Sequence, residues 1–391
     1  MEKHKVGILT MYYNNFNFGG QLQAFALQYA IERIGFDAEQ ICFDFKKSKS
    51  CSLNDEKKLT LNKCKKILRF KFVIKKILKI KVKIDKRKIT RVNNFIKFQN
   101  SILHSEDVYD IGNISKSLNI YDNFVCGSDQ IWNDWGLGKD VLRVYTLDFV
   151  PSNINKFSYA ASSGSRNALI ENKAVLSDGI KKLNSISVRE SHLKEIVEEI
   201  SGENVTVVLD PVFLLSSEEW NKVTSYAMRK TEKKYAVCYF LGTSRKNRKM
   251  AEKLAHQMGL RTVFFPYIEK ECVEDAFCGD IRDYDSGPAE FVQIIKNADY
   301  IFTDSFHATV FAVIFKKDFY VFQRETRISG SQINDRLYDF LEQVGLLDRL
   351  LKNEIRNCNR ITETDYLKTE NIIKKRKEIS LSYLKEALSQ E

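Results

Sequence analysis

Short apolar runs alternate with helical patterns from the beginning of the chain. Residues 6–10 form an apolar run with the length of a buried parallel strand, and a polar loop that ends in Gly19 and Gly20 follows it. Apolar residues then recur at three- and four-residue steps as far as Ile34, and Gly35 ends this predicted helix before a second strand at residues 38–43. The opening pattern therefore predicts a β-α-β unit.

The same alternation continues along the rest of the chain. Further strands are predicted at residues 123–126, 156–161, 185–188, 205–209, 235–241, 262–265, 300–302 and 319–322, and helical patterns cover residues 333–344 and 372–388. Strands that alternate with helices in two successive series are typical of two parallel sheets. We therefore predict an α/β fold with two Rossmann-like domains that face a central cleft.

The length of the chain indicates how these elements divide. A chain of 391 residues exceeds what one hydrophobic core usually spans. We expect an N-terminal domain at residues 1–215, a C-terminal domain at residues 216–365 and a C-terminal helix at residues 366–391. A basic helical insertion at residues 57–105 is expected to interrupt the first domain.

The formal net charge of +11 arises in one segment. Between Lys57 and Arg91 the chain has 16 Lys or Arg residues and one Asp, so the rest of the chain is close to neutral or mildly acidic. Apolar residues of this segment fit one helical face, which favours a solvated helical hairpin packed on the first domain. The alternative is peripheral contact with an anionic membrane. Nucleic acid is not an expected partner, because no recognised binding module accompanies the charge.

Composition and motifs exclude several classes of protein. No run approaches the roughly 18 apolar residues of a spanning helix, and no secretory signal precedes the first strand, so we expect a cytoplasmic protein. The eight cysteines form no Cys-x-x-Cys pair and the five histidines have no partner at ligand spacing, which predicts neither disulfides nor a metal site. Neither a dinucleotide fingerprint nor a P-loop is present, and no cofactor is expected.

Candidate chemistry lies where predicted strands end. Ligands of open parallel sheets bind beyond the carboxyl ends of the strands, where helices begin with free N–H groups. His307 follows Asp304 and Ser305 in the first turn of such a helix, so a bound anion would meet backbone donors and an imidazole together. Arg189 follows another strand, and its planar fork suits a carboxylate or phosphate. The structural alternatives are a histidine bonded to a backbone carbonyl and an arginine paired with Glu190.

Three further strand-end turns carry polar groups. One turn resembles an anion-binding turn and consists of Gly242, Thr243, Ser244 and Arg245. A second combines a flexible backbone with side-chain amides and contains Asn17, Gly19, Gly20 and Gln21. A third combines an acid, an amide and an indole in Asp129, Gln130 and Trp132. The third turn suits a sugar, because aromatic faces stack on sugar rings while polar groups bond hydroxyls. The alternative for Trp132 is a core residue.

Six segments, taken in order, resemble the polysaccharide pyruvyl transferase family. They lie between about residues 5 and 350, at residues 17–27 (from Asn-Phe-Gly-Gly-Gln), 127–132 (Gly-Ser-Asp-Gln-Ile-Trp), 158–162, 186–191, 209–211 (Leu-Asp-Pro) and 287–307. Any one segment is weakly specific, whereas six in the order of the family are jointly specific.

The resemblance implies a fold similar to the glycosyltransferase B type. It also implies transfer of pyruvate from phosphoenolpyruvate, as a co-substrate, to two hydroxyls of a sugar, which leaves a cyclic ketal and phosphate. His307 would be the acid that protonates the enol or the leaving phosphate, and Arg189 would hold donor anions. The C-terminal domain, with Ser305 and the turn at residues 242–245, would bind the donor. The N-terminal domain would bind the acceptor, a saccharide of a surface polysaccharide or its lipid-linked precursor.

One position departs from the family pattern. Many members have an arginine two residues before this histidine, whereas this chain has Ser305 there. Arg245, Arg324 and Arg327 are candidates to replace that cation.

Two other functions fit the same residues. One is a glycosyltransferase of the same fold that binds a nucleotide sugar through residues 242–246 and His307. The other is a sugar- or phosphate-binding protein without turnover. The sequence leaves the acceptor sugar and the oligomeric state open.

Overall fold

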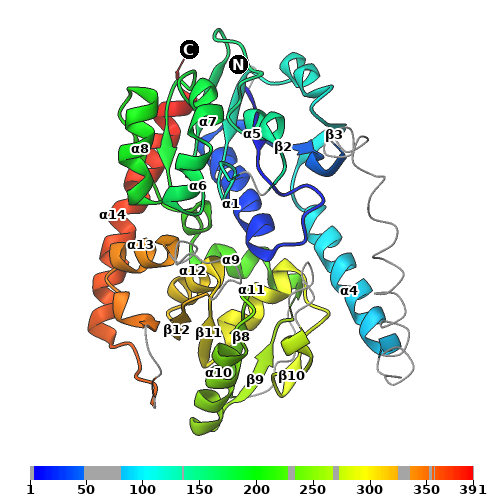
Figure 1. The fold of residues 1–391 in the computed structure, drawn as a ribbon, viewed down its shortest axis with the longest axis vertical. Coiled ribbons are helices and arrows are strands. Elements are labelled where there is room, and N and C mark those ends of the chain that lie inside the picture. The colour runs from blue at the N-terminus through cyan, green and yellow to red at the C-terminus, as the bar shows by residue number, and fades with distance from the viewer. Residues whose placement is uncertain are drawn as a thin grey trace.

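The chain folds into two lobes, each built around a parallel β-sheet (Figure 1). The computed structural model describes residues 4–47, 81–133, 136–227, 234–266, 273–324, 335–351, 355 and 357–390. Residues 57–80 of the predicted insertion and the candidate Arg327 lie outside the described residues.

The N-terminal lobe contains a five-stranded sheet in the order β3-β2-β1-β4-β5, with every pair parallel. Its strands are β1 (Lys5–Leu9), β2 (Asp37–Phe43), β3 (His104–Tyr109), β4 (Asn123–Cys126) and β5 (Asn155–Ser158). A short parallel pair, β6 (Ser187–Val188) and β7 (Thr206–Val207), continues beside β5 through isolated bridges such as that between Ala161 and Val188.

The C-terminal lobe contains a six-stranded parallel sheet in the order β10-β9-β8-β11-β12-β13. Its strands are β8 (Tyr235–Tyr239), β9 (Arg261–Phe264), β10 (Ile281–Arg282), β11 (Tyr300–Thr303), β12 (Asp318–Phe322) and β13 (Leu350–Leu351). The predicted α/β class with two parallel sheets is confirmed.

Helices connect the strands and cover the sheets. In the first lobe and the segment that follows it they are α1 (Phe18–Ile34), α4 (Lys81–Gln99), α5 (Lys139–Val144), α6 (Arg166–Glu171), α7 (Lys173–Ile180), α8 (Ser191–Ser201) and α9 (Ser217–Val223). In the rest of the chain they are α10 (Arg245–Gln257), α11 (Pro288–Asn297), α12 (Phe306–Ile314), α13 (Asp335–Gln343) and α14 (Glu363–Leu388). Short 3-10 helices include η1 (Ile114–Asn119), η2 (Pro211–Leu214), η3 (Ser225–Ala227), η4 (Val273–Ala276) and η6 (Leu347–Arg349).

Alternating side chains of the strands divide the core. Val6 and Ile8 of β1 belong to one hydrophobic cluster with Val237 of β8 and Ile301 of β11, and α1, α11, α12 and α14 contribute to the same cluster. Leu9 belongs to a second cluster, on the other face of the first sheet. The period of two expected of strands therefore separates a core confined to the first lobe from one shared by both lobes.

Helix α4 extends from the N-terminal lobe to the C-terminal lobe (Figure 1). The ring of Phe95 stacks on Phe18 of α1 with 5.1 Å between centroids. On the other lobe, the buried guanidinium of Arg91 donates to the carbonyls of Pro266 and Asp283, and Arg87 Nε lies 2.9 Å from Asp285 Oδ1. The described part of the basic segment is thus helical, and it packs on both lobes, whereas the predicted hairpin packed on the first alone.

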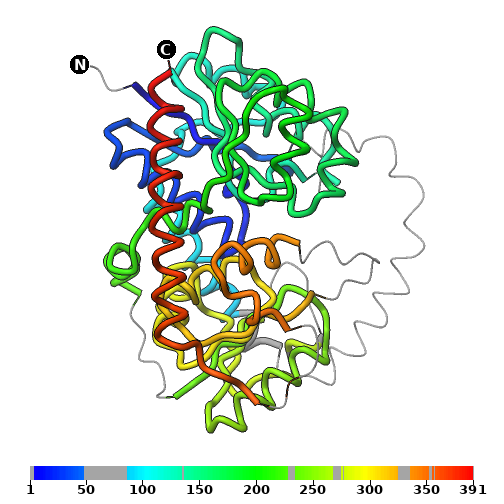
Figure 2. The backbone as a smooth tube through the Cα atoms, turned by 90° about the vertical axis from the view of Figure 1, so that its left-hand side faces the viewer, coloured from blue at the N-terminus to red at the C-terminus, as the bar shows by residue number. Residues whose placement is uncertain are grey.

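Helix α14 runs along both lobes near the C-terminus (Figure 2). Thr369 Oγ1 donates to the carbonyl of Val344 in the C-terminal lobe at 2.9 Å. Further along, Ser380 Oγ accepts from the N–H of Leu209 at 2.9 Å, and Tyr383 Oη donates to the carbonyl of Ser158 at 2.8 Å. This helix fixes the segment that leads to residue 210.

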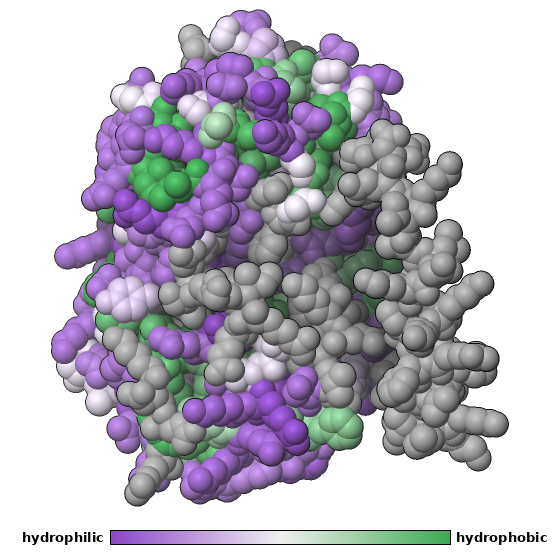
Figure 3. Space-filling model, viewed as in Figure 1, coloured by the Kyte–Doolittle hydropathy of each residue, from purple (hydrophilic) through white to green (hydrophobic). Residues whose placement is uncertain are grey.

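Much of the described surface seen in Figure 3 is hydrophilic, with smaller apolar patches between. Within the part of the chain that the structure describes, no helix combines the length and the apolar character needed to cross a membrane.

Candidate active site

His307 lies where the two lobes meet. It is in the first turn of α12, directly after β11, and Ser305 is the N-cap residue. The side chain is buried and faces Asp210, which caps the 3-10 helix η2 at the end of the first lobe. His307 Nε2 lies 3.5 Å from Asp210 Oδ2. The imidazole therefore lies beyond the carboxyl end of a strand of the second sheet, where the strand-end rule expects ligands to bind. The other lobe supplies its acidic neighbour.

Asp210 is the central anion of the site. Its Oδ2 accepts from Arg189 Nη1 at 2.8 Å and from Ser128 Oγ at 3.3 Å, and its Oδ1 accepts from the N–H of Val212 at 3.1 Å. Burial alone would raise the pKa of this carboxyl, but His307, Arg189 and the Val212 N–H together hold the pKa well below its usual range. Asp210 therefore stays ionised.

Arg189 is held by carboxylates of the chain itself. Its Nε donates to Glu190 Oε1 at 2.9 Å, its Nη1 donates to Asp210, and its Nη2 lies 3.9 Å from Asp129 Oδ1. Its guanidinium also lies 4.3 Å from the centroid of the Phe306 ring. Burial acts to lower the pKa of Arg189, but Glu190, Asp210 and Asp129 outweigh it and raise the pKa. The pairing with Glu190 that was the structural alternative is present.

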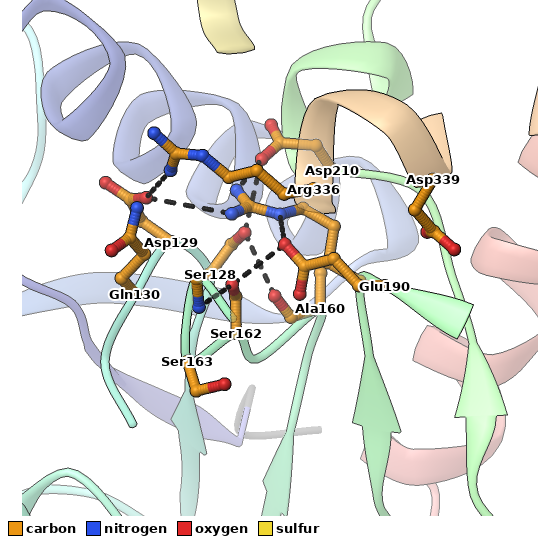
Figure 4. A network of polar contacts seen from close by, with 12 residues as sticks. Ser128, Asp129, Gln130, Ala160, Ser162, Ser163, Glu190, Asp210, Arg336 and Asp339 are labelled. Carbon is orange, nitrogen blue, oxygen red and sulfur yellow. Dashed lines mark hydrogen bonds and ion pairs between the residues drawn. The ribbon is translucent and has the colours of Figure 1, made fainter. Parts of the chain in front are cut away.

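Arg336 of α13 is a second buried guanidinium at the same place (Figure 4). It lies 5.9 Å from the Phe306 ring centroid and 4.0 Å from Asp129 Oδ1, and the Gln130 amide faces it, with the oxygen accepting from both Nη groups when it points that way. Burial, reinforced by Arg324 and Arg189, lowers the pKa of Arg336 to about 9.

These groups line one small pocket between the lobes. Its polar wall is formed by Arg189, Glu190, Asp210, Arg336 and Asp339, and the Phe306 ring lies among apolar side chains. The pocket thus borders the residue that precedes His307. It brings two planar guanidinium groups, a type of group that binds carboxylates and phosphates, together with three carboxyl groups.

Gly19 of α1 packs directly against the imidazole. A methyl group added to Gly19 would overlap Nδ1 of His307. Asn17 caps α1 by accepting from the N–H of Gly20, and Gln21 Nε2 donates to the carbonyls of Tyr12 and Asn15. The structure therefore brings one member of this predicted turn, Gly19, against His307, while Asn17 and Gln21 hold the turn itself.

Asp304 occupies the turn at residues 241–245. Its carboxylate accepts from the N–H of Leu241 at 2.7 Å and from the N–H of Gly242 at 2.8 Å. Ser244 caps α10, and Thr243 and Arg245 are exposed. The N–H groups of this turn thus donate to a carboxylate of the chain itself in this structure. Binding of a donor anion by residues 242–245 stays a prediction.

The third predicted turn divides between the site and the core. Asp129 and Gln130 reach Arg336, whereas Trp132 is fully buried in the core of the first lobe. Its indole faces are closed to a sugar ring, so the structure agrees with the core alternative for this residue.

Ser305 and Arg324 lie beside the same turn. Ser305 is buried, and its carbonyl accepts from Thr309 Oγ1 at 2.9 Å. Arg324 Nη2 donates to the carbonyl of Asp304 at 2.7 Å. Among the arginines considered for the missing cation, Arg324 is therefore placed next to the helix that bears His307.

Among the described residues, no group of three or more His, Cys, Asp or Glu side chains is arranged to hold a metal ion.

Sequence reasoning gave no role to Asp210 or Arg336. Asp210 follows a predicted strand, so the rule that selected Arg189 also applied to it. Arg336 lies one turn before Phe340 on the apolar stripe of a predicted helix. A charged residue on such a stripe indicates a buried charge, and this could have identified Arg336 as a site residue.

Comparisons with solved structures bear on the fold of the chain. Solved structures similar in fold include S. aureus MnaA with UDP (12% identity, 98% of this chain and 91% of the other, TM-score 0.50). Another is a putative UDP-N-acetylglucosamine 2-epimerase of Listeria monocytogenes (10% identity, 95% of this chain and 95% of the other, TM-score 0.48). A third is E. coli ADP-heptose lps heptosyltransferase II (9% identity, 95% of this chain and 99% of the other, TM-score 0.37).

The predicted fold of the glycosyltransferase B type is confirmed. No curated protein sequence matches the chain. The model of the polysaccharide pyruvyl transferase family matches residues 17–325, well over half of the chain. The chain belongs to the polysaccharide pyruvyl transferase family, and it is a transferase by membership.

Proposed function

We propose that the chain transfers pyruvate from phosphoenolpyruvate to two hydroxyls of one sugar in a surface polysaccharide or its lipid-linked precursor. The observation that carries the proposal is the buried approach of His307 to the ionised Asp210 between the lobes. Membership of the family supplies the reaction class, and the site supplies groups that suit it.

The reaction needs two proton movements. The acid-base group gives a proton to C3, which becomes a methyl group, and takes up the proton that one sugar hydroxyl loses as its oxygen attacks C2. The second hydroxyl then attacks C2, the C2–O bond to phosphate breaks, and the second hydroxyl proton balances the charge of the released phosphate. A buried acid-base group near C3 and cations near the phosphate and carboxylate would serve these steps.

His307 is assigned as that acid-base group, with Asp210 as its orienting partner. Asp210 Oδ2 lies 3.5 Å from Nε2, so its negative charge would stabilise the protonated imidazole. The Nδ1 side of the ring faces Gly19 without room for a methyl group. A reactant therefore reaches that side only when α1 or the imidazole moves.

Arg189 contributes in two ways. It anchors Asp210 through Nη1, and its Nη2 has no hydrogen-bond partner among the described residues. This buried N–H group suits the phosphate or carboxylate of phosphoenolpyruvate, while the other N–H groups of the guanidinium donate to carboxylates of the chain.

Nucleotide-sugar transfer is the rival function. It would use the turn at residues 242–246 and His307 for the diphosphate, as is common at helix N-termini. In this structure the N–H groups of Leu241 and Gly242 already donate to Asp304, so a diphosphate there would have to displace a buried carboxylate.

Ligand-dependent melting separates the two functions. Phosphoenolpyruvate should raise the melting temperature of the chain, whereas UDP, GDP and CMP sugars should leave it unchanged, because only a ligand of the native state stabilises it. In the same preparation, a panel of lipid-linked saccharides should gain one pyruvyl ketal in the mass spectrum. Stabilisation by a nucleotide sugar with transfer of that sugar would contradict the proposal.

A further inference from the structure

We propose that the pocket beneath Phe306 binds the anionic end of the donor, and that Arg336 supplies the cation that Ser305 does not. This inference rests on the proposed function and names the residue that selects a small enol phosphate. The position two residues before His307 holds a serine, and the geometry points to α13 as the source of the replacing charge.

Arg336 is placed as such a residue must be. Its side chain is 6% exposed, it lines the pocket, and its guanidinium lies against the Phe306 ring, one residue from the imidazole. Arg189 lies against the same ring. The two planar forks therefore share one aromatic neighbour and border one cavity, an arrangement that suits a phosphate or carboxylate.

The two arginines differ in how their charge is balanced. Arg189 donates to Glu190 and Asp210 at 2.9 and 2.8 Å. Arg336 has one ion pair among the described residues, with Asp129 at 4.0 Å, and its Nε has no hydrogen-bond partner there. The Gln130 amide oxygen, when it points toward Arg336, accepts from both Nη groups but carries no charge. A buried cation balanced by one carboxylate at this distance is costly, and a bound anion would reduce that cost.

The other acids of the pocket accept hydrogen bonds from the chain itself, although Glu190 Oε2 has no hydrogen-bond partner among the described residues. Glu190 accepts from Arg189 and from Ser162 Oγ, and Asp339 accepts from the N–H of Ser191 at 3.0 Å and from Gln343. The pocket therefore keeps Arg336 as the group that an incoming anion would neutralise.

Substitution of Arg336 separates this role from a structural one. Arg336→Met keeps the stem and removes the charge, so the KM for phosphoenolpyruvate should rise about 10- to 100-fold with a smaller change in kcat. The melting temperature should stay unchanged or rise, because an undercompensated buried charge is removed. Arg336→Lys keeps the charge without the fork and should give an intermediate KM.

Arg349→Met is the matched control. Arg349 is also a buried arginine against an aromatic ring, Tyr320 at 5.2 Å, but it pairs with Asp348 and donates to the carbonyl of Asn359, away from the pocket. Arg349→Met should lower the melting temperature and leave the KM for phosphoenolpyruvate unchanged. A KM within about twofold of wild type for both Arg336 variants would overturn the inference. Failure of phosphoenolpyruvate to bind the wild-type chain would overturn the proposed function, and the inference with it.

Discussion

Asp210 and His307 approach each other from different lobes, and each is nearly removed from water. A buried carboxylate persists only where cations and hydrogen-bond donors surround it. Arg189 provides the cation, Ser128 an O–H and Val212 an N–H. The same contacts that keep Asp210 ionised also hold it in reach of the imidazole. Stability and acid-base chemistry thus depend on one side chain.

Asp210→Asn should show this dependence through pH. The pKa of Asp210 is lower in the folded chain than in the unfolded chain, so the unfolded chain binds more protons near the ordinary pKa of about 3.9. The contribution of Asp210 is therefore present above about pH 4 and is lost as the pH falls below it. Near pH 7 the variant should lose roughly 3–5 kcal/mol of unfolding free energy, and the two chains should converge on acidification.

Urea unfolding between neutral and acidic pH measures this difference. Asp178→Asn is the control, because Asp178 is 63% exposed and lies 4.0 Å from Arg143, so its stability should change by less than about 0.5 kcal/mol. Parallel stability curves for wild type and Asp210→Asn would contradict the assigned ionisation.

Gly19 and Gly20 offer a matched pair of substitutions. Both lie in α1, where alanine is favoured over glycine by up to about 1 kcal/mol. The methyl group of Gly20→Ala would lie 3.4 Å from Asn15 Nδ2, so this change should be neutral or stabilising, whereas Gly19→Ala meets the His307 ring and should cost about 1–3 kcal/mol. The melting temperature and the turnover rate should both fall for Gly19→Ala and not for Gly20→Ala. Equal effects of the two variants would exclude the close contact between Gly19 and His307.

At the scale of elements, most of the fold was predictable because the strands are short apolar runs. The predicted strand at residues 123–126 coincides with β4, and the predicted end of α1 before Gly35 agrees with its left-handed φ of 112°. Strand β3 was missed because it is an edge strand with mostly exposed polar side chains, and such a strand lacks an apolar run.

The candidate site was only partly predictable. The strand-end rule found His307 and Arg189 because their chain neighbours identify them. It did not predict that Asp210, Arg336 and Gly19 would gather around them, because these contacts join segments far apart in the sequence and two different lobes.

Helix α4 supplies a prediction at the same scale. Arg91 is 2% exposed and donates to two carbonyls of the other lobe, so Arg91→Met should destabilise the chain by about 2–4 kcal/mol while keeping the apolar stem. Lys86→Met, an exposed position of the same helix, should change stability by less than about 0.5 kcal/mol. Equal urea midpoints for both variants would show that α4 does not join the lobes.

At the scale of the whole molecule, the shared hydrophobic cluster, α4 and α14 hold the two lobes together around the site. This construction explains why an acid from one lobe and an imidazole from the other can meet out of water. It also means that the site depends on the position of one lobe relative to the other.

The central claim is that His307 moves the proton that turns phosphoenolpyruvate into a pyruvyl ketal. The most direct measurement is the mass spectrum of a saccharide acceptor after reaction with phosphoenolpyruvate in D₂O. The wild-type chain should add one pyruvyl ketal with deuterium in its methyl group, and His307→Gln should add none while remaining folded, with a cooperative melting transition. A ketal formed by His307→Gln at the wild-type rate, or transfer of a nucleotide sugar instead, would contradict the claim.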